Sequence, residues 1–143
     1  MVNRAFVSWL VMLLVAVVNG AFREAVLRPR YGALPAHQIS TVMLCVELLV
    51  LTWFTIAWIR PPSAKIAGNI GWAWLVLTLV FEFGAGLAAR KSWAVMLGDY
   101  NFTNGHIWPL ALLVTGLAPY VMYRVRHIRT TAPSPPARNS RGR

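Results

Sequence analysis

Residues 70–91 read IGWAWLVLTLVFEFGAGLAARK, and this stretch decides the class of fold. A helix of roughly 20 apolar residues crosses the ~30 Å hydrocarbon core of a membrane. One carboxylate, Glu82, interrupts the apolar run, and two cations, Arg90 and Lys91, close it. We therefore expect a transmembrane helix that carries an ionisable group inside the bilayer.

Three further stretches of the chain have the same apolar character. The predicted spans cover about residues 5–27, 35–59, 70–90 and 107–123. The first should end before Pro29, because the residue preceding a proline is biased out of the α region. The last is the shortest, and Pro109 and Pro119 make it the span most prone to bend. The sequence thus predicts an all-α membrane protein, a four-transmembrane-helix bundle with short loops.

The composition agrees with this class. Of the 143 residues, 57% are hydrophobic and 13% are charged, whereas soluble domains carry about 25% charged residues. Lys and Arg number 14 against 4 acidic residues, which gives a formal net charge of +10. These cations flank the apolar runs, as topology signals and lipid-headgroup contacts do. Nucleic acid is therefore not an expected partner, and membrane lipids are.

The distribution of the cations sets the expected orientation. Four spans place both termini and the central loop on one face, which then holds nine cations, namely Arg4, Arg60, Lys65, Arg124, Arg126, Arg129, Arg138, Arg141 and Arg143. The other face holds five, namely Arg23, Arg28, Arg30, Arg90 and Lys91. Because cytoplasmic segments carry the excess of Lys and Arg, both termini should be cytoplasmic.

The ends of the chain differ from the spans. Residues 130–143 are basic and rich in Pro and Ser, so this tail should be disordered and residues 1–129 should form the transmembrane domain. At the other end, Arg4 and the apolar run that follows also resemble a signal peptide. The lack of a clean A-x-A site, and a helical pattern that continues through Glu24, favour a retained span.

The polar residues of the spans gather toward the non-cytoplasmic face. By the 1.5 Å rise per residue, Glu47 lies roughly 13 Å below the outer end of its span and Glu82 roughly 12 Å below the end of the next. Asn19 lies a turn below Arg23. An ionised carboxylate in hydrocarbon must face the bundle, pair with a cation or take up a proton. Arg90, two turns above Glu82 on nearly the same face, is the first candidate for that cation.

These positions predict an outward-facing polar pocket with Asn19, Glu47 and Glu82 at its floor. The candidate residues of the whole cluster are Asn19, Arg23, Glu24, Arg28, His37, Glu47, Glu82, Arg90, Asp99 and His106. The structural alternative is that Glu47 and Glu82 only lock the helices together, since polar contacts commonly join transmembrane helices.

His37 and His106 raise the question of a metal. Each stands at the start of an inward-running span, so the two could lie at equal depth. Metal or haem ligation would need several such groups to converge. The sequence has no H-E-x-x-H motif and a single cysteine, Cys45, so we expect no metal and no cofactor.

Several runs resemble a group of small bacterial four-span membrane proteins of uncharacterised function. The runs are NGAFREAVLRPRYG (residues 19–32), FEFGAG (81–86), RKSW (90–93) and GHIWPLALL (105–113). The resemblance covers about Asn19 to Tyr120 and leaves out the tail. It implies a bacterial plasma-membrane protein and carries over no activity and no catalytic residue.

Three functions fit these residues. The first is an accessory or binding protein whose pocket takes an anionic group, such as a lipid headgroup or a partner's acidic loop. The second is a membrane-embedded enzyme on a lipid-linked substrate, with Glu47, Glu82, Asp99 or His106 as general base. The third is a proton or ion carrier, which would need a homo-oligomer, because the inner half of each span has no ionisable residue. The first is the expected function, and assembly into an oligomer or a larger membrane complex is left open.

Overall fold

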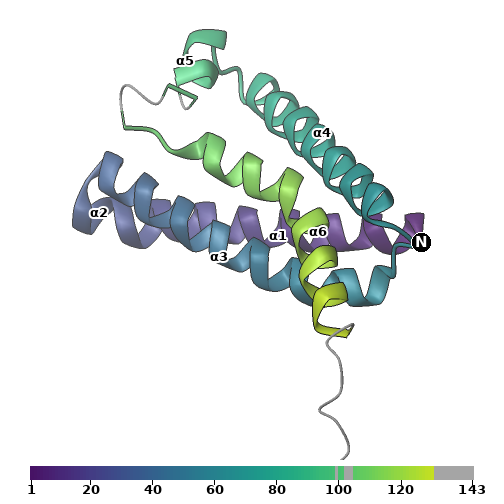
Figure 1. The fold of residues 1–143 in the computed structure, drawn as a ribbon. Coiled ribbons are helices and arrows are strands. Elements are labelled where there is room, and N and C mark those ends of the chain that lie inside the picture. The colour runs from purple at the N-terminus through teal and green to yellow at the C-terminus, as the bar shows by residue number, and fades with distance from the viewer. Residues whose placement is uncertain (99, 102–104, 131–143) are drawn as a thin grey trace, which may run out of the picture.

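The computed structural model describes residues 1–98, 100–101 and 105–130, and every regular element in these ranges is a helix (Figure 1). In chain order the elements are α1 (Val2–Phe22), the π-helix η1 (Arg23–Leu27), α2 (Arg28–Tyr31), α3 (Ala33–Ile59), α4 (Ala64–Ala88), α5 (Trp93–Gly98) and α6 (Trp108–Thr130). The all-α class expected from the sequence is confirmed.

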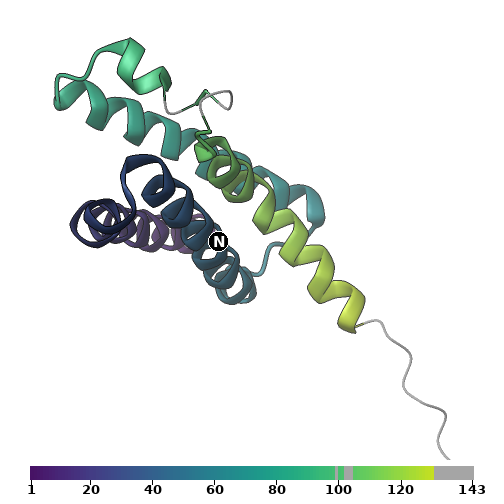
Figure 2. The same ribbon diagram turned by 90° about the vertical axis from the view of Figure 1, so that its left-hand side faces the viewer.

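The four long helices of the described chain form two antiparallel hairpins. One hairpin joins α1 to α3, the other joins α4 to α6, and α6 also packs along α3 (Figures 1 and 2). The N-terminus, the end of α3 and the start of α4 lie together at one end of the molecule, the N-terminal end. The elements α2 and α5 and the starts of α3 and α6 lie at the opposite end, the α5 end. Between them the core packs Trp9, Met12, Leu44, Leu48, Trp74 and Ala111.

The first hairpin departs from the predicted helix end at Leu27. The helix continues to Tyr31, because η1 widens the turn and the backbone N–H of Arg28 bonds to the carbonyl of Arg23. A proline in a regular α-helix loses one hydrogen bond and clashes with the carbonyl four residues earlier. The π-turn just before Pro29 relieves this conflict, and such single π-turns often occur at functional sites. Gly32, at φ +83°, then ends the helix and begins α3.

The turn from α3 to α4 is set by capping residues. Arg60 takes a left-handed conformation at φ 53° and ends α3, and Pro61 and Pro62 prevent its continuation. The side chain of Ser63 then accepts a hydrogen bond from the backbone N–H of Ile66 at 3.3 Å. This N-cap starts α4 at Ala64, earlier than the predicted start at residue 70.

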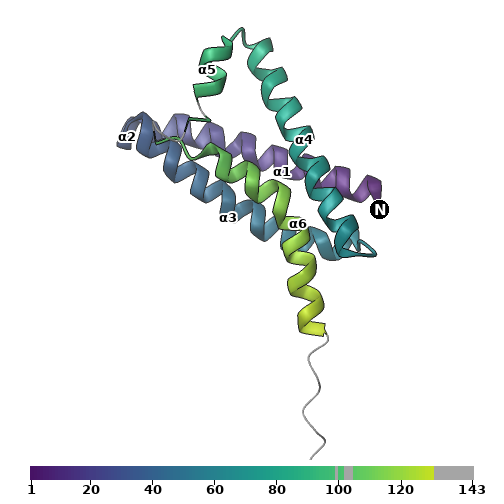
Figure 3. The ribbon, with the colours of Figure 1, turned by 45° about the horizontal axis from the view of Figure 1, so that its top comes forward.

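α1 and α4 are joined toward the N-terminal end and separate toward the α5 end. Trp74 donates its indole N–H to the carbonyl of Ala5 at 2.9 Å, and Trp9 donates its indole N–H to the hydroxyl of Thr78 at 3.1 Å. Beyond these bonds α4 turns away from α1 as it approaches α5 (Figure 3).

α4 and α6 approach each other most closely at two glycines. A Cβ atom on Gly71 would overlap the backbone oxygen of Gly116 and crowd the ring of Pro119. Pro119 lies inside α6, and the helix changes direction along its length, as expected from its prolines (Figure 3).

Three stretches of the described chain are long and apolar enough to cross a membrane, namely Val2–Tyr31, Ala33–Ile59 and Ala64–Ala88. Large apolar side chains cover their outer faces, and Val18, Phe54, Trp72 and Val80 are each at least 60% exposed. An apolar surface of this extent is consistent with a membrane protein. The fourth predicted span is not among the three, because α6 carries Pro, Tyr and Arg residues among its apolar ones. It also runs beyond its predicted end at Tyr123, to Thr130, and residues 131–143 of the predicted disordered tail lie outside the described residues.

Candidate functional site

The predicted polar cluster is divided into three places. Asn19 is buried on α1 and donates its side-chain amide N–H to Glu47 Oε2 on α3 at 3.4 Å. This length marks a weak hydrogen bond. The expected proximity of Asn19 and Glu47 is therefore found, and the contact joins the two helices of the first hairpin.

Glu82 lines a cavity whose lining includes neither Asn19 nor Glu47, and it has a different partner. The phenol of Tyr100, just after α5, donates a hydrogen bond to Glu82 Oε2 at 2.8 Å. The ring of Tyr100 stacks on Phe83, with centroids 5.8 Å apart. The expected floor shared by Asn19, Glu47 and Glu82 is not formed.

Arg90 does not pair with Glu82, contrary to the expectation from spacing. α4 ends at Ala88, and Arg90 follows in a left-handed conformation at φ 56° with an exposed side chain. Among the described residues no ion pair joins Arg90 to Glu82. The expectation placed Arg90 on the helix of Glu82, but the chain leaves that helix before Arg90, so helical spacing no longer sets where its side chain lies.

Five of the candidate residues line one pocket at the α5 end, which we call the arginine pocket. Its volume is about 390 Å³, and its lining consists of Arg23, Glu24, Arg28, Ala33, Leu34, Ala36, His37 and His106. η1 and α2 supply the charged side, and the start of α3 supplies the opposite wall. His106 comes from the segment before α6.

The charged side of the arginine pocket is held in place by one carboxylate. Glu24 accepts a hydrogen bond from Arg23 Nε at 3.1 Å and one from Arg28 Nη1 at 2.7 Å. Each guanidinium has five N–H donors, so most donors of both arginines remain for another acceptor. Two cations against one anion leave this wall positive.

The histidine side of the pocket is formed where α3 and α6 begin. The rings of His37 and His106 meet edge to face, with centroids 5.1 Å apart. Gln38 links the start of α3 to the segment before α6, because its side-chain N–H donates a hydrogen bond to the carbonyl of Gly105 at 2.9 Å. Nδ1 of His106 is buried and, within the described part of the chain, has no hydrogen-bond partner. The described residues hold no group of three or more His, Cys, Asp or Glu side chains suited to a metal ion.

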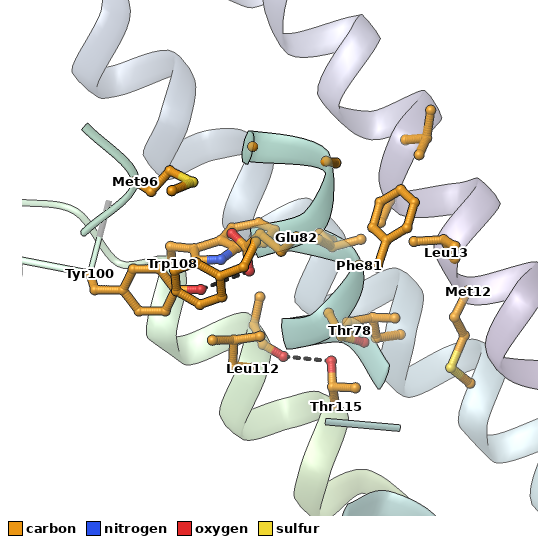
Figure 4. A pocket seen from close by; sticks show the side chains of 18 of the residues that line it. Met12, Leu13, Thr78, Phe81, Glu82, Met96, Tyr100, Trp108, Leu112 and Thr115 are labelled. Atoms are coloured by element: carbon orange, nitrogen blue, oxygen red, sulfur yellow. Dashed lines mark hydrogen bonds between the residues drawn. The ribbon is translucent and has the colours of Figure 1, made fainter. Parts of the chain in front are cut away.

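A second cavity lies inside the bundle, and we call it the intramembrane cavity. Its volume is about 310 Å³, and residues of α1, α3, α4 and α6 line it together with Lys91, Met96 and Tyr100 (Figure 4). Most of the lining is apolar. Glu82, Tyr100 and the indole of Trp108 lie together on one side of it (Figure 4).

Of the other candidates, Asn19, Glu47 and Arg90 line neither cavity. Asp99 lies outside the described residues. Tyr100, Trp108 and Lys91 line the intramembrane cavity and were not among the candidates. Trp108 stands at the start of the last predicted span, where amphipathic rings favour the headgroup layer, so the sequence gives no sign that it lines a cavity. No motif of the sequence marks Tyr100.

Comparisons of the chain with models of protein families, with curated proteins and with solved structures find no match.

Proposed function

We propose that this chain is a four-span plasma-membrane protein of a bacterium, with both termini in the cytoplasm, whose arginine pocket binds an anionic group on the outer face. α6 serves as the fourth span in this proposal. It starts at the α5 end and runs antiparallel to α4, and near the N-terminal end Arg126 donates a hydrogen bond to the carbonyl of Trp53 at 2.5 Å. The Arg126 guanidinium also lies 4.2 Å from the centre of the Trp53 ring.

The orientation is supported by the cations at the N-terminal end. Arg4 donates a hydrogen bond to the carbonyl of Trp58 at 2.9 Å, and its guanidinium lies 5.6 Å from the centre of that ring. A guanidinium that lies over a tryptophan ring is a cation–π contact, and tryptophan is enriched at the membrane–water interface. In the four-span topology, the termini and the central loop together carry nine Lys and Arg residues of the sequence against five on the other face, which favours the cytoplasmic side for them.

The observation that carries the proposal is the pair of arginines fixed by Glu24. Arg23 and Arg28 are oriented before any ligand arrives, so less rotamer freedom is lost on binding. Guanidinium groups match the oxygens of phosphate and carboxylate in forked hydrogen bonds. The buried Nδ1 of His106 adds a polar atom to the opposite wall.

A lipid headgroup fits this pocket better than an acidic loop of a partner protein. The pocket lies where α1 ends and α3 begins, at the ends of two apolar helices. Phe22 and Tyr31 beside it are 39% and 57% exposed. Exposed aromatic rings at the ends of spans lie in the headgroup layer, where lipid phosphates are concentrated.

The experiment is the identification of lipids that remain bound after extraction in mild detergent. Mass spectrometry of the purified protein should find anionic phospholipid on the wild type, and about tenfold less on Arg28→Gln, since a charged hydrogen bond contributes about 1.5–3 kcal/mol. Arg30→Gln is the matched control, because Arg30 lies on the same short helix, is exposed and does not line the pocket. Equal lipid on all three proteins would refute the proposal.

The enzyme alternative rests on one observation, the hydrogen bond of 2.8 Å between Tyr100 and Glu82 inside a cavity. Such a pair could move a proton on a lipid-linked substrate. The carrier alternative is weakened by the hydroxyls deeper in the bundle. Ser8, Thr52 and Thr115 each donate to a carbonyl of their own helix, so they form no polar path across the membrane.

A further inference from the structure

The intramembrane cavity is comparable in length to one membrane leaflet. Its lining on α4 runs from Thr78 to Gly86, and Ala89, just after the helix, extends it. At 1.5 Å per residue the helical part of this wall is about 12 Å long. Half of a ~30 Å hydrocarbon core is ~15 Å, so a cavity of this length spans most of one leaflet.

The cavity reaches the lipid-facing surface between α1 and α4. Val17 and Phe81 both line it and are 52% and 42% exposed. Figure 4 shows Phe81 directed from α4 toward Leu13 of α1. The bonds that tie the two helices lie toward the N-terminal end, at Trp74 and Trp9, and α4 leaves α1 beyond them. A hydrocarbon chain can therefore enter sideways from the leaflet without crossing the headgroup layer.

The walls of the cavity favour hydrocarbon over water. Met12, Leu44, Leu48 and Leu112 line it and are buried from the surface of the molecule. Water enters a cavity only where several polar partners are available. If the cavity were empty, these side chains would lose van der Waals contacts on one side, whereas a hydrocarbon chain would restore them.

One polar group in the cavity marks where the head of the occupant would lie. Nε1 of Trp108 is buried and has no hydrogen-bond partner among the described residues. An indole N–H donates only, so it suits an ester, hydroxyl or phosphate oxygen. Lys91 lines the cavity beyond the end of α4 and adds a cation on that side.

We infer that the intramembrane cavity holds a single hydrocarbon chain, acyl or prenyl, of a lipid from the leaflet at the α5 end, with an oxygen of that lipid accepting a hydrogen bond from Trp108. This site is distinct from the arginine pocket, and it does not require that pocket to bind an anion. The acyl and prenyl sources share the same chemistry in the cavity and differ in how the chain is attached to its head.

Photo-crosslinking of the full chain in nanodiscs tests the inference. Two probes are used in turn, a phosphatidylglycerol with a diazirine in its acyl chain and a prenyl phosphate with a diazirine in its chain. Met12 and Leu48 are 4% and 5% exposed, so lipid outside the protein cannot reach them. We expect one or both probes to label these two residues, and the stronger probe identifies the source of the chain.

Phe54 serves as the internal reference, because it is 65% exposed and faces bulk lipid. Ala16→Phe places a ring in the cavity and should abolish labelling of Met12 and Leu48 while labelling of Phe54 persists. Ala21→Phe is its control, because Ala21 is an exposed residue of α1 that does not line the cavity. Trp108→Phe should reduce labelling roughly fivefold, the effect of one lost hydrogen bond.

Wild-type protein that is labelled at Phe54 and at neither Met12 nor Leu48, with both probes, would overturn the inference without any variant having to fold. Labelling of those residues that persists at wild-type level in folded Ala16→Phe would overturn it as well. Arg28→Gln should leave the labelling unchanged, so failure of the arginine pocket and failure of this cavity can be distinguished.

Discussion

Glu82 accepts a hydrogen bond from Tyr100 in a part of the molecule where apolar side chains predominate. The sequence predicts a depth for Glu82 from the rise of a helix, because that needs only the sequence and one geometric constant. Its partner could not, because Tyr100 reaches it through the short helix α5 and the turn before it. The direction of such a turn depends on tertiary packing, which spacing in the sequence does not contain.

Replacement of Tyr100 by Phe tests this contact. The carboxylate would lose one donor in a poorly hydrated site, so we expect a loss of about 1–3 kcal/mol in stability. The readout is the melting temperature in mild detergent. Glu82→Gln in the Tyr100→Phe background should recover part of the loss, because an amide is less costly to desolvate than a carboxylate.

Tyr31→Phe is the matched control, since Tyr31 is 57% exposed and lies outside both cavities. An unchanged melting temperature in Tyr100→Phe would mean that the phenol does not support Glu82.

The existence of the long helices could be predicted wherever hydropathy alone defines them. The spans 5–27, 35–59 and 70–90 each correspond to a long helix, because continuous apolar stretches indicate such helices directly. The predicted residues at which helices end or begin were wrong where local backbone chemistry sets them. Pro29 is accommodated by the π-turn η1, so the first helical stretch continues to Tyr31 and does not end at Leu27. The Ser63 cap starts α4 at Ala64, before the predicted residue 70.

The packing of α4 on α6 gives a prediction from two glycines of the same helix. Gly71→Ala should destabilise the protein by about 1–3 kcal/mol, because the new methyl group overlaps the backbone of Gly116 and the two helices must separate. Gly84 has nothing within 4 Å of a built Cβ atom, so Gly84→Ala should be neutral or stabilising by up to about 1 kcal/mol through helix propensity. Thermal denaturation in detergent measures both.

Equal melting temperatures for the Gly71 and Gly84 variants would show that α4 and α6 are not in close contact at Gly71. Small residues are common where membrane helices pack closely, but the sequence does not show which of Gly71, Gly84 and Gly86 faces a neighbouring helix.

At the scale of the whole molecule, α6 decides the topology. Three stretches of the described chain are long and apolar enough to span a membrane, and α6 is not one of them. α6 nevertheless packs against both α3 and α4. We expect it to cross the membrane because its neighbours on both sides, α3 and α4, are long and apolar enough to span one. Reporter domains fused after residue 143 and inserted at Gly98 should therefore report opposite sides, with the C-terminal one in the cytoplasm.

Both reporters on the same side would show that the chain crosses the membrane three times and that α6 does not span. Opposite sides in the reverse sense would place the arginine pocket in the cytoplasm.

The structure brings together five of the candidate residues and separates the two carboxylates of the spans. Sequence spacing places Arg23, Glu24, Arg28, His37 and His106 at one face, and these five line one pocket. Depth does not fix the direction in which a side chain points around a helix, so Glu47 and Glu82, although expected at similar depth, belong to different contacts. An apolar cavity leaves no sequence motif, and the intramembrane cavity became visible only in the structure.

The most direct test of the arginine pocket is a titration of the detergent-solubilised protein with a short-chain phosphatidylglycerol, with short-chain phosphatidylcholine as the comparison. We expect saturable binding of the anionic lipid at one site, weakened by added salt because the contact is charged. Arg23→Gln and Arg28→Gln should each raise its Kd about tenfold, and Arg30→Gln should leave it unchanged. The contrary result would be equal Kd values for the two lipids in the wild type, or a Kd that the arginine substitutions in the pocket do not alter.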